Sequence, residues 1–178
     1  MSPPGTEVPG TGTDGRPAMD PDLLAAAAAL PAAVVAGFAV RRWLLFVTVV
    51  HSVSMAPALS PGQRVLTRRL RNPARIRRGN IVVASSLELG RTVVKRVLGL
   101  PGEQVVIEPA GSIRVNGRPV PEPYVAYPGG PGGTFQVPPG HVLLLGYNRA
   151  CSTDSRHWNQ PYVPVAAVRG TVIHRRVP

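Results

Sequence analysis

Residues 91–100 have the sequence Arg-Thr-Val-Val-Lys-Arg-Val-Leu-Gly-Leu, which combines a strand pattern with the only lysine of the chain. Its β-branched residues predict a β-strand. Side chains alternate between the two faces of a strand, so Val93, Lys95 and Val97 share one face. An amine between two valines is poorly hydrated, which lowers its pKa toward the range that suits a general base.

Lys95 is the only lysine of the chain. Of the twenty lysine and arginine residues, nineteen are arginine. Arginine can replace lysine as a surface charge, but it stays protonated at every accessible pH. Two interpretations are open. The single lysine is either a chance survivor of a coding bias toward arginine, or a site that needs an amine able to become neutral. The apolar neighbours favour the second.

A second segment supplies hydroxyl groups. Residues 51–62 follow an apolar run and end in turn signals, Pro57 and Pro61-Gly62. Ser52 and Ser54 lie two residues apart, so in an extended segment both point toward one site. One hydroxyl could then attack while the other donates a hydrogen bond. The alternative is that both serines bond only to the local backbone before the turn.

Four segments, taken in order, resemble the sequence boxes of type I signal peptidases, which are membrane-bound Ser/Lys endopeptidases. The resemblance covers the chain from about Arg42 to Pro178. It implies a compact fold of antiparallel sheets and no metal or cofactor. The four segments are Ser54–Leu59, Gly79–Val83, Val94–Glu103 and Gly146–Arg156.

The resemblance also implies the roles of individual residues. Ser54 matches the nucleophile, and Lys95 matches the general base that takes its proton. Ser52 matches a serine whose hydroxyl helps the Ser54 N–H to form the oxyanion hole. In the last segment, Ser152 matches the serine that orients the lysine amine. The pair next to it, which shapes the loop beside the site, is Asp154 and Arg156.

Some positions depart from the family pattern. Asn80 and Tyr147 stand where the family has aspartates, which leaves Arg96 without an expected carboxylate partner. Ala58 replaces a common threonine, and Asn159 replaces a common glycine. None of these changes removes a proposed catalytic atom, so we expect them to affect substrate fit.

Other chemistries fit the sequence poorly. The histidines are scattered without metal-ligand spacing, and His51, near Ser54, would point to the opposite face of an extended segment. Cys151 is the only cysteine, which rules out an intrachain disulfide. A cysteine nucleophile would also need a lowered pKa and a paired histidine.

The chain has three compositional zones. Residues 1–22 are rich in proline, glycine and acidic residues, and we expect a disordered tail. Leu23–Val40 is uncharged and would span about 27 Å as a helix, so we predict a transmembrane anchor at residues 23–42. A cleaved signal peptide and a soluble alanine-rich helix are the alternatives. The long acidic segment before the run disfavours the first of these.

Two arguments about topology disagree. Arg41 and Arg42 follow the predicted anchor, and the positive-inside rule would then place the following domain in the cytoplasm. The resemblance implies the reverse, a single-pass protein of the cell membrane with its catalytic domain on the extracytoplasmic side. We follow the resemblance, because the charge rule is statistical.

Residues 43–178 predict one mainly β catalytic domain, and Asn116-Gly117 predicts a hairpin turn. The predicted strands are Trp43–Val50, Arg64–Leu70, Ile81–Ser85, Thr92–Leu100, Gln104–Ile107, Ile113–Val115, Phe135–Val137, Val142–Leu145 and Thr171–His174.

The formal charge of +11 is concentrated in this domain. The stretch from Arg64 to Arg78 holds seven arginines and no acid. Without a recognised nucleic-acid-binding module we expect no nucleic acid, and two interpretations remain: contact with anionic lipid headgroups or a solvated arginine-rich loop.

As a whole, the sequence predicts a membrane-anchored serine endopeptidase that removes signal peptides from exported preproteins. One alternative is a maturation protease of the same family that serves one or few substrates. The other is a non-catalytic, membrane-anchored β domain that binds precursors.

Overall fold

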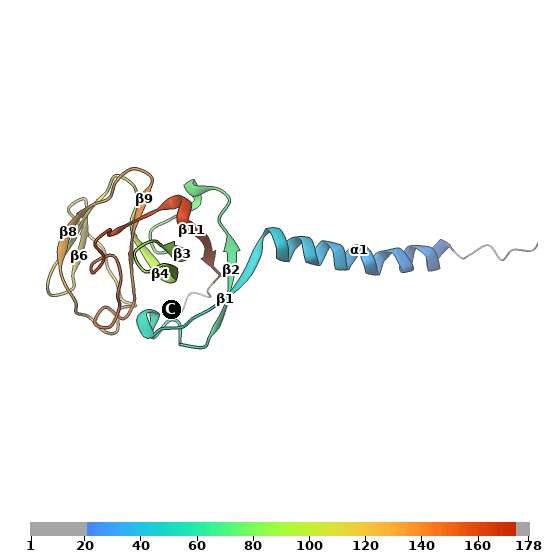
Figure 1. Cartoon of the computed structure of the whole chain (residues 1–178), viewed down its shortest axis with the longest axis horizontal. Helices are drawn as coiled ribbons and strands as arrows, with labels where there is room; N and C mark the ends of the chain where they lie inside the picture. Colours follow the sequence, from blue (N-terminus) through green and yellow to red (C-terminus); the bar gives the residue numbers. More distant parts are fainter. Residues whose placement is uncertain (1–20, 174–178) are drawn as a thin grey trace, which may run out of the picture. The chain divides into compact units, whose positions relative to one another are not determined.

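The structure is a computed structural model that describes residues 21–173 (Figure 1). Helix α1 (Pro21–Trp43) confirms the helix expected from the apolar run and contains Pro31. The predicted disordered tail lies outside the described residues, except for Pro21 and Asp22, which begin α1. Within the described residues no helix has both the length and the hydropathy of a membrane span. The transmembrane anchor at residues 23–42 therefore stays a prediction.

The chain divides inside α1, between Phe38 and Ala39, into two compact units. The second unit contains two antiparallel sheets, which confirms the mainly β prediction. The larger sheet has the strand order β1-β2-β11-β3-β4-β9-β10 and the smaller has the order β7-β6-β5-β8.

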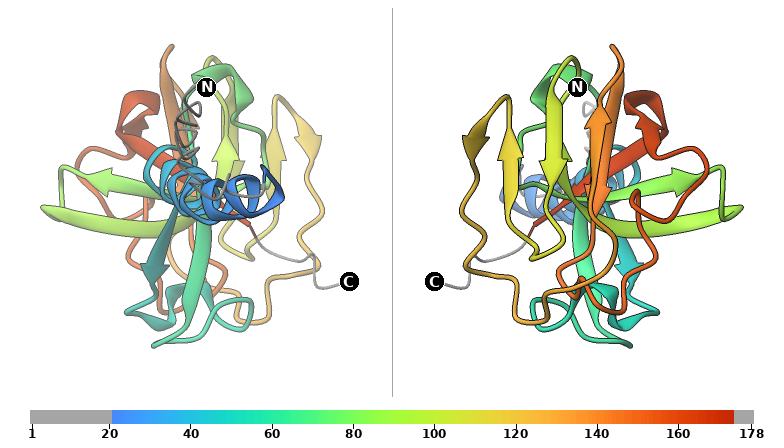
Figure 2. Two further views of the ribbon diagram at one scale, coloured as in Figure 1. Left: turned by 90° about the vertical axis from the view of Figure 1, so that its right-hand side faces the viewer. Right: turned by 90° about the vertical axis from the view of Figure 1, so that its left-hand side faces the viewer.

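In the right-hand view of Figure 2, the yellow and gold strands of the smaller sheet lie side by side at one edge of the domain. The strands are β1 (Leu45–Val49), β2 (Arg64–Arg69), β3 (Ile81–Ser86), β4 (Arg91–Gly99), β5 (Gln104–Ile107), β6 (Ile113–Val115), β7 (Arg118–Pro119), β8 (Gly133–Gln136), β9 (His141–Leu145), β10 (Tyr162–Pro164) and β11 (Val168–Val172).

Strand β4 is the centre of this arrangement. It pairs with β3 along Arg91–Arg96 and with β9 only from Arg96 onward. At Gly99 the chain passes so close to its neighbours that a Cβ would lie 2.8 Å from Val137 Cγ2, so a larger residue would not fit there. Two apolar clusters flank the strand, one within the larger sheet and one between the two sheets. Their burial holds β4 in a fixed position.

Most predicted strands are confirmed, and the differences have local causes. Asn116 and Gly117 both have positive φ, 49° and 75°, and connect β6 to β7 as the predicted hairpin turn. Strand β10 was missed because its three residues end in Pro164, a residue that disfavours strands. The last strand begins at Val168, three residues before the predicted start.

Candidate active site

Ser54 lies on a single 3₁₀ turn, Val53–Met55, that follows β1. The extended conformation expected here is therefore wrong. The two hydroxyls nevertheless meet, since Ser52 Oγ and Ser54 Oγ are 3.0 Å apart. Ser54 is buried and Ser52 is exposed.

Apolar packing and a backbone hydrogen bond stabilise this turn. Met55 and Leu59 are fully buried in a cluster with residues of β2, β3 and the segment after β9. The backbone N–H of Asn148 donates to the carbonyl of Ser54 at 3.1 Å. A Cβ at Gly146 would overlap both this carbonyl and Ser152 Oγ, so only glycine permits this close approach. The last segment and the nucleophile turn are thereby packed together.

Lys95 enters the same site from β4. Its side chain is only 4 % exposed, and its Nζ donates to Ser152 Oγ at 3.1 Å. Burial lowers the pKa of Lys95 to about 8; the Asp154 carboxylate opposes this shift, and the positive charges of Arg91 and Arg156 add to it. About one lysine in eleven is then neutral at pH 7, compared with about four in ten thousand for an ordinary lysine.

A buried network fixes Ser152. The Asp154 carboxylate accepts hydrogen bonds from the backbone N–H of Gly146 at 3.0 Å and from Arg156 Nε at 2.9 Å. Burial alone would raise the pKa of Asp154. The hydrogen bonds from Arg156, Gly146 and the Ser152 hydroxyl outweigh it and hold that pKa below its usual value. Ser152 thus lies between this carboxylate and Lys95, whose amine donates to its hydroxyl oxygen.

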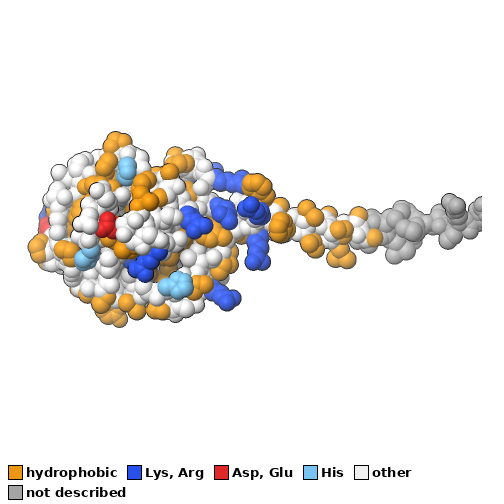
Figure 3. All heavy atoms as spheres, in the orientation of Figure 1, with side chains coloured by type: hydrophobic (Ala, Val, Ile, Leu, Met, Phe, Trp, Pro, Cys, Tyr) orange, Lys and Arg blue, Asp and Glu red, His pale blue; other side chains and the backbone are white. Residues whose placement is uncertain are grey.

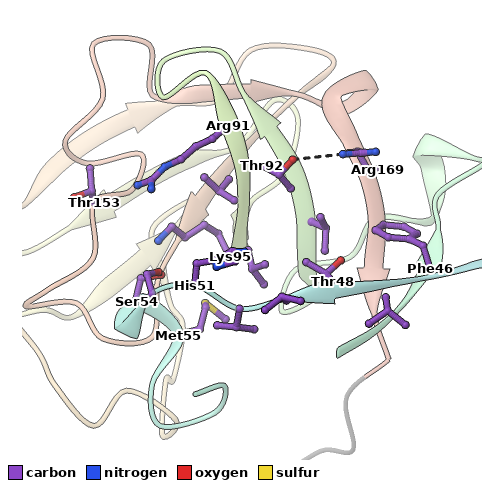
Figure 4. A pocket seen from close by; sticks show the side chains of 17 residues that line it. Phe46, Thr48, His51, Ser54, Met55, Arg91, Thr92, Lys95, Thr153 and Arg169 are labelled. Carbon is purple, nitrogen blue, oxygen red and sulfur yellow. Dashed lines mark hydrogen bonds between the residues drawn. The ribbon is translucent and has the colours of Figure 1, made fainter. Parts of the chain in front are cut away.

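Ser54, Ser52 and Lys95 line one cavity of about 400 Å³ (Figure 4). Among the described residues no hydrogen bond joins Ser54 to Lys95, although both face this cavity. Its walls include β1 and the first half of β4. Within residues 21–173, β1 pairs only with β2, and the first half of β4 has no strand partner on the β9 side. An extended chain could add to either free edge.

Next to the catalytic residues, the structure adds Tyr124, Glu122 and Arg149, which the sequence did not single out, to the contacts of Arg96 and Tyr147. Arg96 donates to Tyr147 Oη, and its guanidinium lies 3.8 Å from the ring centroid of Tyr124. These two contacts occupy the arginine for which the sequence left no carboxylate partner. Next to them, Glu122 and Arg149 form an ion pair of 2.6 Å whose side chains are at most 8 % exposed. The aromatic character of Tyr147 was the available signal, because a guanidinium stacks on aromatic rings.

The remaining candidates are placed as follows. Cys151 is exposed, next to Ser152. His51 is exposed and lines the cavity, so the opposite-face expectation for it fails together with the extended conformation. Asn80 accepts a hydrogen bond from the backbone N–H of Arg77 at 2.9 Å in the turn before β3.

Comparison with known proteins identifies the class. The sequence profile of the family described as signal peptidase, peptidase S26, matches residues 23–176. The chain therefore belongs to the signal peptidase family, and the resemblance carried by the four segments is confirmed.

Individual relatives agree with this assignment. The signal peptidase I of Leptolyngbya laminosa is 31 % identical over 172 residues, which are 90 % of this chain and 82 % of the relative. The signal peptidase I of Bacillus licheniformis is 32 % identical over 70 % of this chain and 73 % of its own. A crystal structure of a signal peptidase I from Enterococcus faecalis is 30 % identical, covers 55 % of this chain and 96 % of that one, and has a TM-score of 0.49.

Proposed function

We propose that this protein is a serine endopeptidase that removes signal peptides from exported preproteins, with Ser54 as nucleophile and Lys95 as general base. The observation that carries the proposal is the environment of Lys95. A buried amine with a pKa near 8, oriented by Ser152 and facing the same cavity as Ser54, has the properties of a base that works near neutral pH.

In the proposed reaction Ser54 Oγ attacks the scissile carbonyl carbon while Lys95 Nζ takes the hydroxyl proton. The tetrahedral intermediate collapses, the C–N bond breaks, and Lys95 returns the proton to the leaving amine. A water molecule, deprotonated by the same amine, then hydrolyses the acyl-enzyme ester and releases Ser54. The Ser54–Lys95 hydrogen bond would form on substrate binding, since such bonds are often long in free enzymes.

Ser52 would stabilise the developing oxyanion. Its hydroxyl lies 3.0 Å from the Ser54 hydroxyl, at the first residue before the 3₁₀ turn that carries Ser54. The Ser52 O–H and the Ser54 N–H would donate to the carbonyl oxygen as it gains charge. Removing one such donor typically costs about 2.7–4 kcal/mol in the transition state.

The substrate would bind as an extended strand between the free edges of β1 and β4. The cavity beside Ser54 has a volume of about 400 Å³ and apolar walls from Val50, Met55 and Val94, which suit apolar substrate side chains. Small residues at the first and third positions before the scissile bond are what the family resemblance implies.

The cellular setting that we infer is the cell membrane, with α1 as a single-pass anchor and the catalytic unit on the extracytoplasmic side. Support comes from the uncharged run and from the exposed apolar side chains Leu30, Val34, Val35 and Phe38. Fractionation, followed by protease treatment of intact and opened cells, tests both parts. A catalytic unit that is digested only after the cells are opened would contradict the assigned side.

We also infer contact of the arginine-rich stretch with anionic headgroups. In Figure 3 the Lys and Arg side chains gather on the side of the domain where β2 lies. Arg78 differs from the others, because it pairs with Glu103 at 2.6 Å. The exposed members are Arg64, Arg68, Arg71, Arg75 and Arg77. Replacing them by glutamine should weaken sedimentation with phosphatidylglycerol vesicles and leave phosphatidylcholine unaffected.

The direct test of the main proposal uses a panel of preproteins and the purified full-length protein in detergent. New N-termini are mapped after incubation with the wild-type protein and with Ser54→Ala. Cleavage behind small residues by the wild type alone would support the proposal. Binding of the precursors without any new N-terminus would instead favour the non-catalytic alternative.

A further inference from the structure

The cavity beside Ser54 is lined by several basic groups. Of the part of the chain that the structure describes, seventeen residues line it, including Arg91, Arg169, His51 and Lys95, and neither aspartate nor glutamate is among them. The walls of a cleft with one sign of charge attract ligand groups of the opposite sign. The charge of this cleft therefore bears on which substrates it accepts.

Arg91 is the member of this set with a free charge. It begins β4 and lies four positions before Lys95, about 13 Å along a strand; because this spacing is even, the two side chains emerge on the same face. Figure 4 shows both side chains pointing from β4 toward the side where Ser54 and Thr153 lie. Arg91 is exposed, and within residues 21–173 its guanidinium has neither a hydrogen bond nor an ion pair. Its positive charge also lowers the pKa of Lys95, although burial lowers it more.

The other arginine of the cavity is already engaged. Arg169 Nη1 lies 3.4 Å from Thr92 Oγ1, and its guanidinium lies 6.0 Å from the ring centroid of Phe46. Arg91 has five donor N–H groups in a planar fork, which is the geometry that binds a carboxylate with two parallel hydrogen bonds.

Resting on the proposed function, we propose that Arg91 is a specificity-determining residue that binds an acidic side chain of the substrate close to the scissile bond. If the substrate pairs as a strand with the free edge of β4, one of its residues lies opposite Lys95 and another lies opposite Arg91. These two substrate residues are four positions apart in the substrate sequence. The acidic residue should therefore lie three to five residues from the cut, on one side of it. This preference for an acidic residue adds to the preference for small residues next to the cut. Different parts of the cavity wall would produce the two preferences, so they are independent.

The test is a scan of one precursor peptide that the wild-type protein cleaves. At each of six positions on either side of the cut, glutamate is compared with glutamine, and kcat/KM is measured for both peptides. The ratio of the two values cancels any effect of a variant on the base, because both peptides use the same Lys95. We expect a glutamate preference of about three- to tenfold at one or two neighbouring positions three to five residues from the cut, as for a charge pair at a partly solvated interface.

Three variants make the test specific. In Arg91→Gln the preference should fall to about one, and in Arg91→Glu a lysine at the same position should become the better residue. Arg118→Gln removes an exposed arginine of β7, remote from this cavity, and should retain the wild-type ratio. A preference at no position, or one that persists in Arg91→Gln, would overturn the inference while leaving the proposed peptidase intact. Failure to cleave any peptide would instead remove the proposed function.

Discussion

The pH dependence of peptide cleavage is the sharpest test of the proposed base. If neutral Lys95 accepts the Ser54 proton, kcat/KM must follow the neutral fraction of this amine. The amine has a pKa of about 8 because it is buried. The activity should therefore rise with pH, with a midpoint near 8, and level off above pH 9.

The magnitude follows from this midpoint. About 9 % of the amine is neutral at pH 7 and about 91 % at pH 9, so kcat/KM should increase about tenfold over this interval and little thereafter. An exposed lysine with an ordinary pKa near 10.4 would give an increase of about a hundredfold between pH 7 and 9, with no plateau before pH 10. A histidine base would place the midpoint near 6.5.

The assay is cleavage of a fluorogenic precursor peptide in detergent between pH 5.5 and 10.5, at constant ionic strength. Arg91→Gln removes a nearby positive charge, so the midpoint should move up. Asp154→Asn removes a nearby negative charge, so it should move down, provided that circular dichroism shows an unchanged fold. Lys95→Arg keeps the charge but cannot deprotonate, and its rate should be near background at every pH. A midpoint near 6.5 in the wild type, or substantial activity of Lys95→Arg, would refute the reasoning and direct attention to His51.

Three further predictions concern other parts of the site. Ser54→Ala should abolish cleavage in the same assay, whereas Cys151→Ser should leave it nearly unchanged, because the thiol is exposed and is not among the residues that line the cavity. The opposite result would mean that the nucleophile is misassigned. Ser52→Ala should lower kcat about 10²–10³-fold with little change in KM, since the lost hydrogen bond forms mainly in the transition state; an unchanged kcat would leave the Ser54 N–H as the main donor. Glu122→Gln should reduce the free energy of unfolding by about 3–5 kcal/mol, measured by urea denaturation, because it leaves the buried Arg149 charge uncompensated; a loss below 1 kcal/mol would show that solvent reaches the pair.

Several features of the site were predictable from the sequence because they depend on local chemistry. The alternation along residues 91–100 predicted that Val93, Lys95 and Val97 share a face, and all three are buried. The Asn116-Gly117 turn was predictable for the same reason, since positive φ favours these two residues. The pairing of β10 with β9 was not predictable, because the sequence of a three-residue strand that ends in proline hardly differs from that of a loop.

The mainly β class, the family and the residue types available for catalysis can be predicted from short segments of sequence, because alternation, turn chemistry and residue identity are local properties. How these segments meet depends on the tertiary fold. Lys95 and Ser152 are 57 positions apart in the sequence, yet Lys95 Nζ lies 3.1 Å from Ser152 Oγ. The Ser52 and Ser54 hydroxyls meet at a 3₁₀ turn and not along an extended segment. The pairing of Arg96 with Tyr147 and Tyr124, and the free guanidinium of Arg91 over the cavity, likewise depend on packing between strands distant in the chain. The physical reason is that the burial which lowers the pKa of Lys95 is created by all the surrounding elements together, and no single segment specifies it.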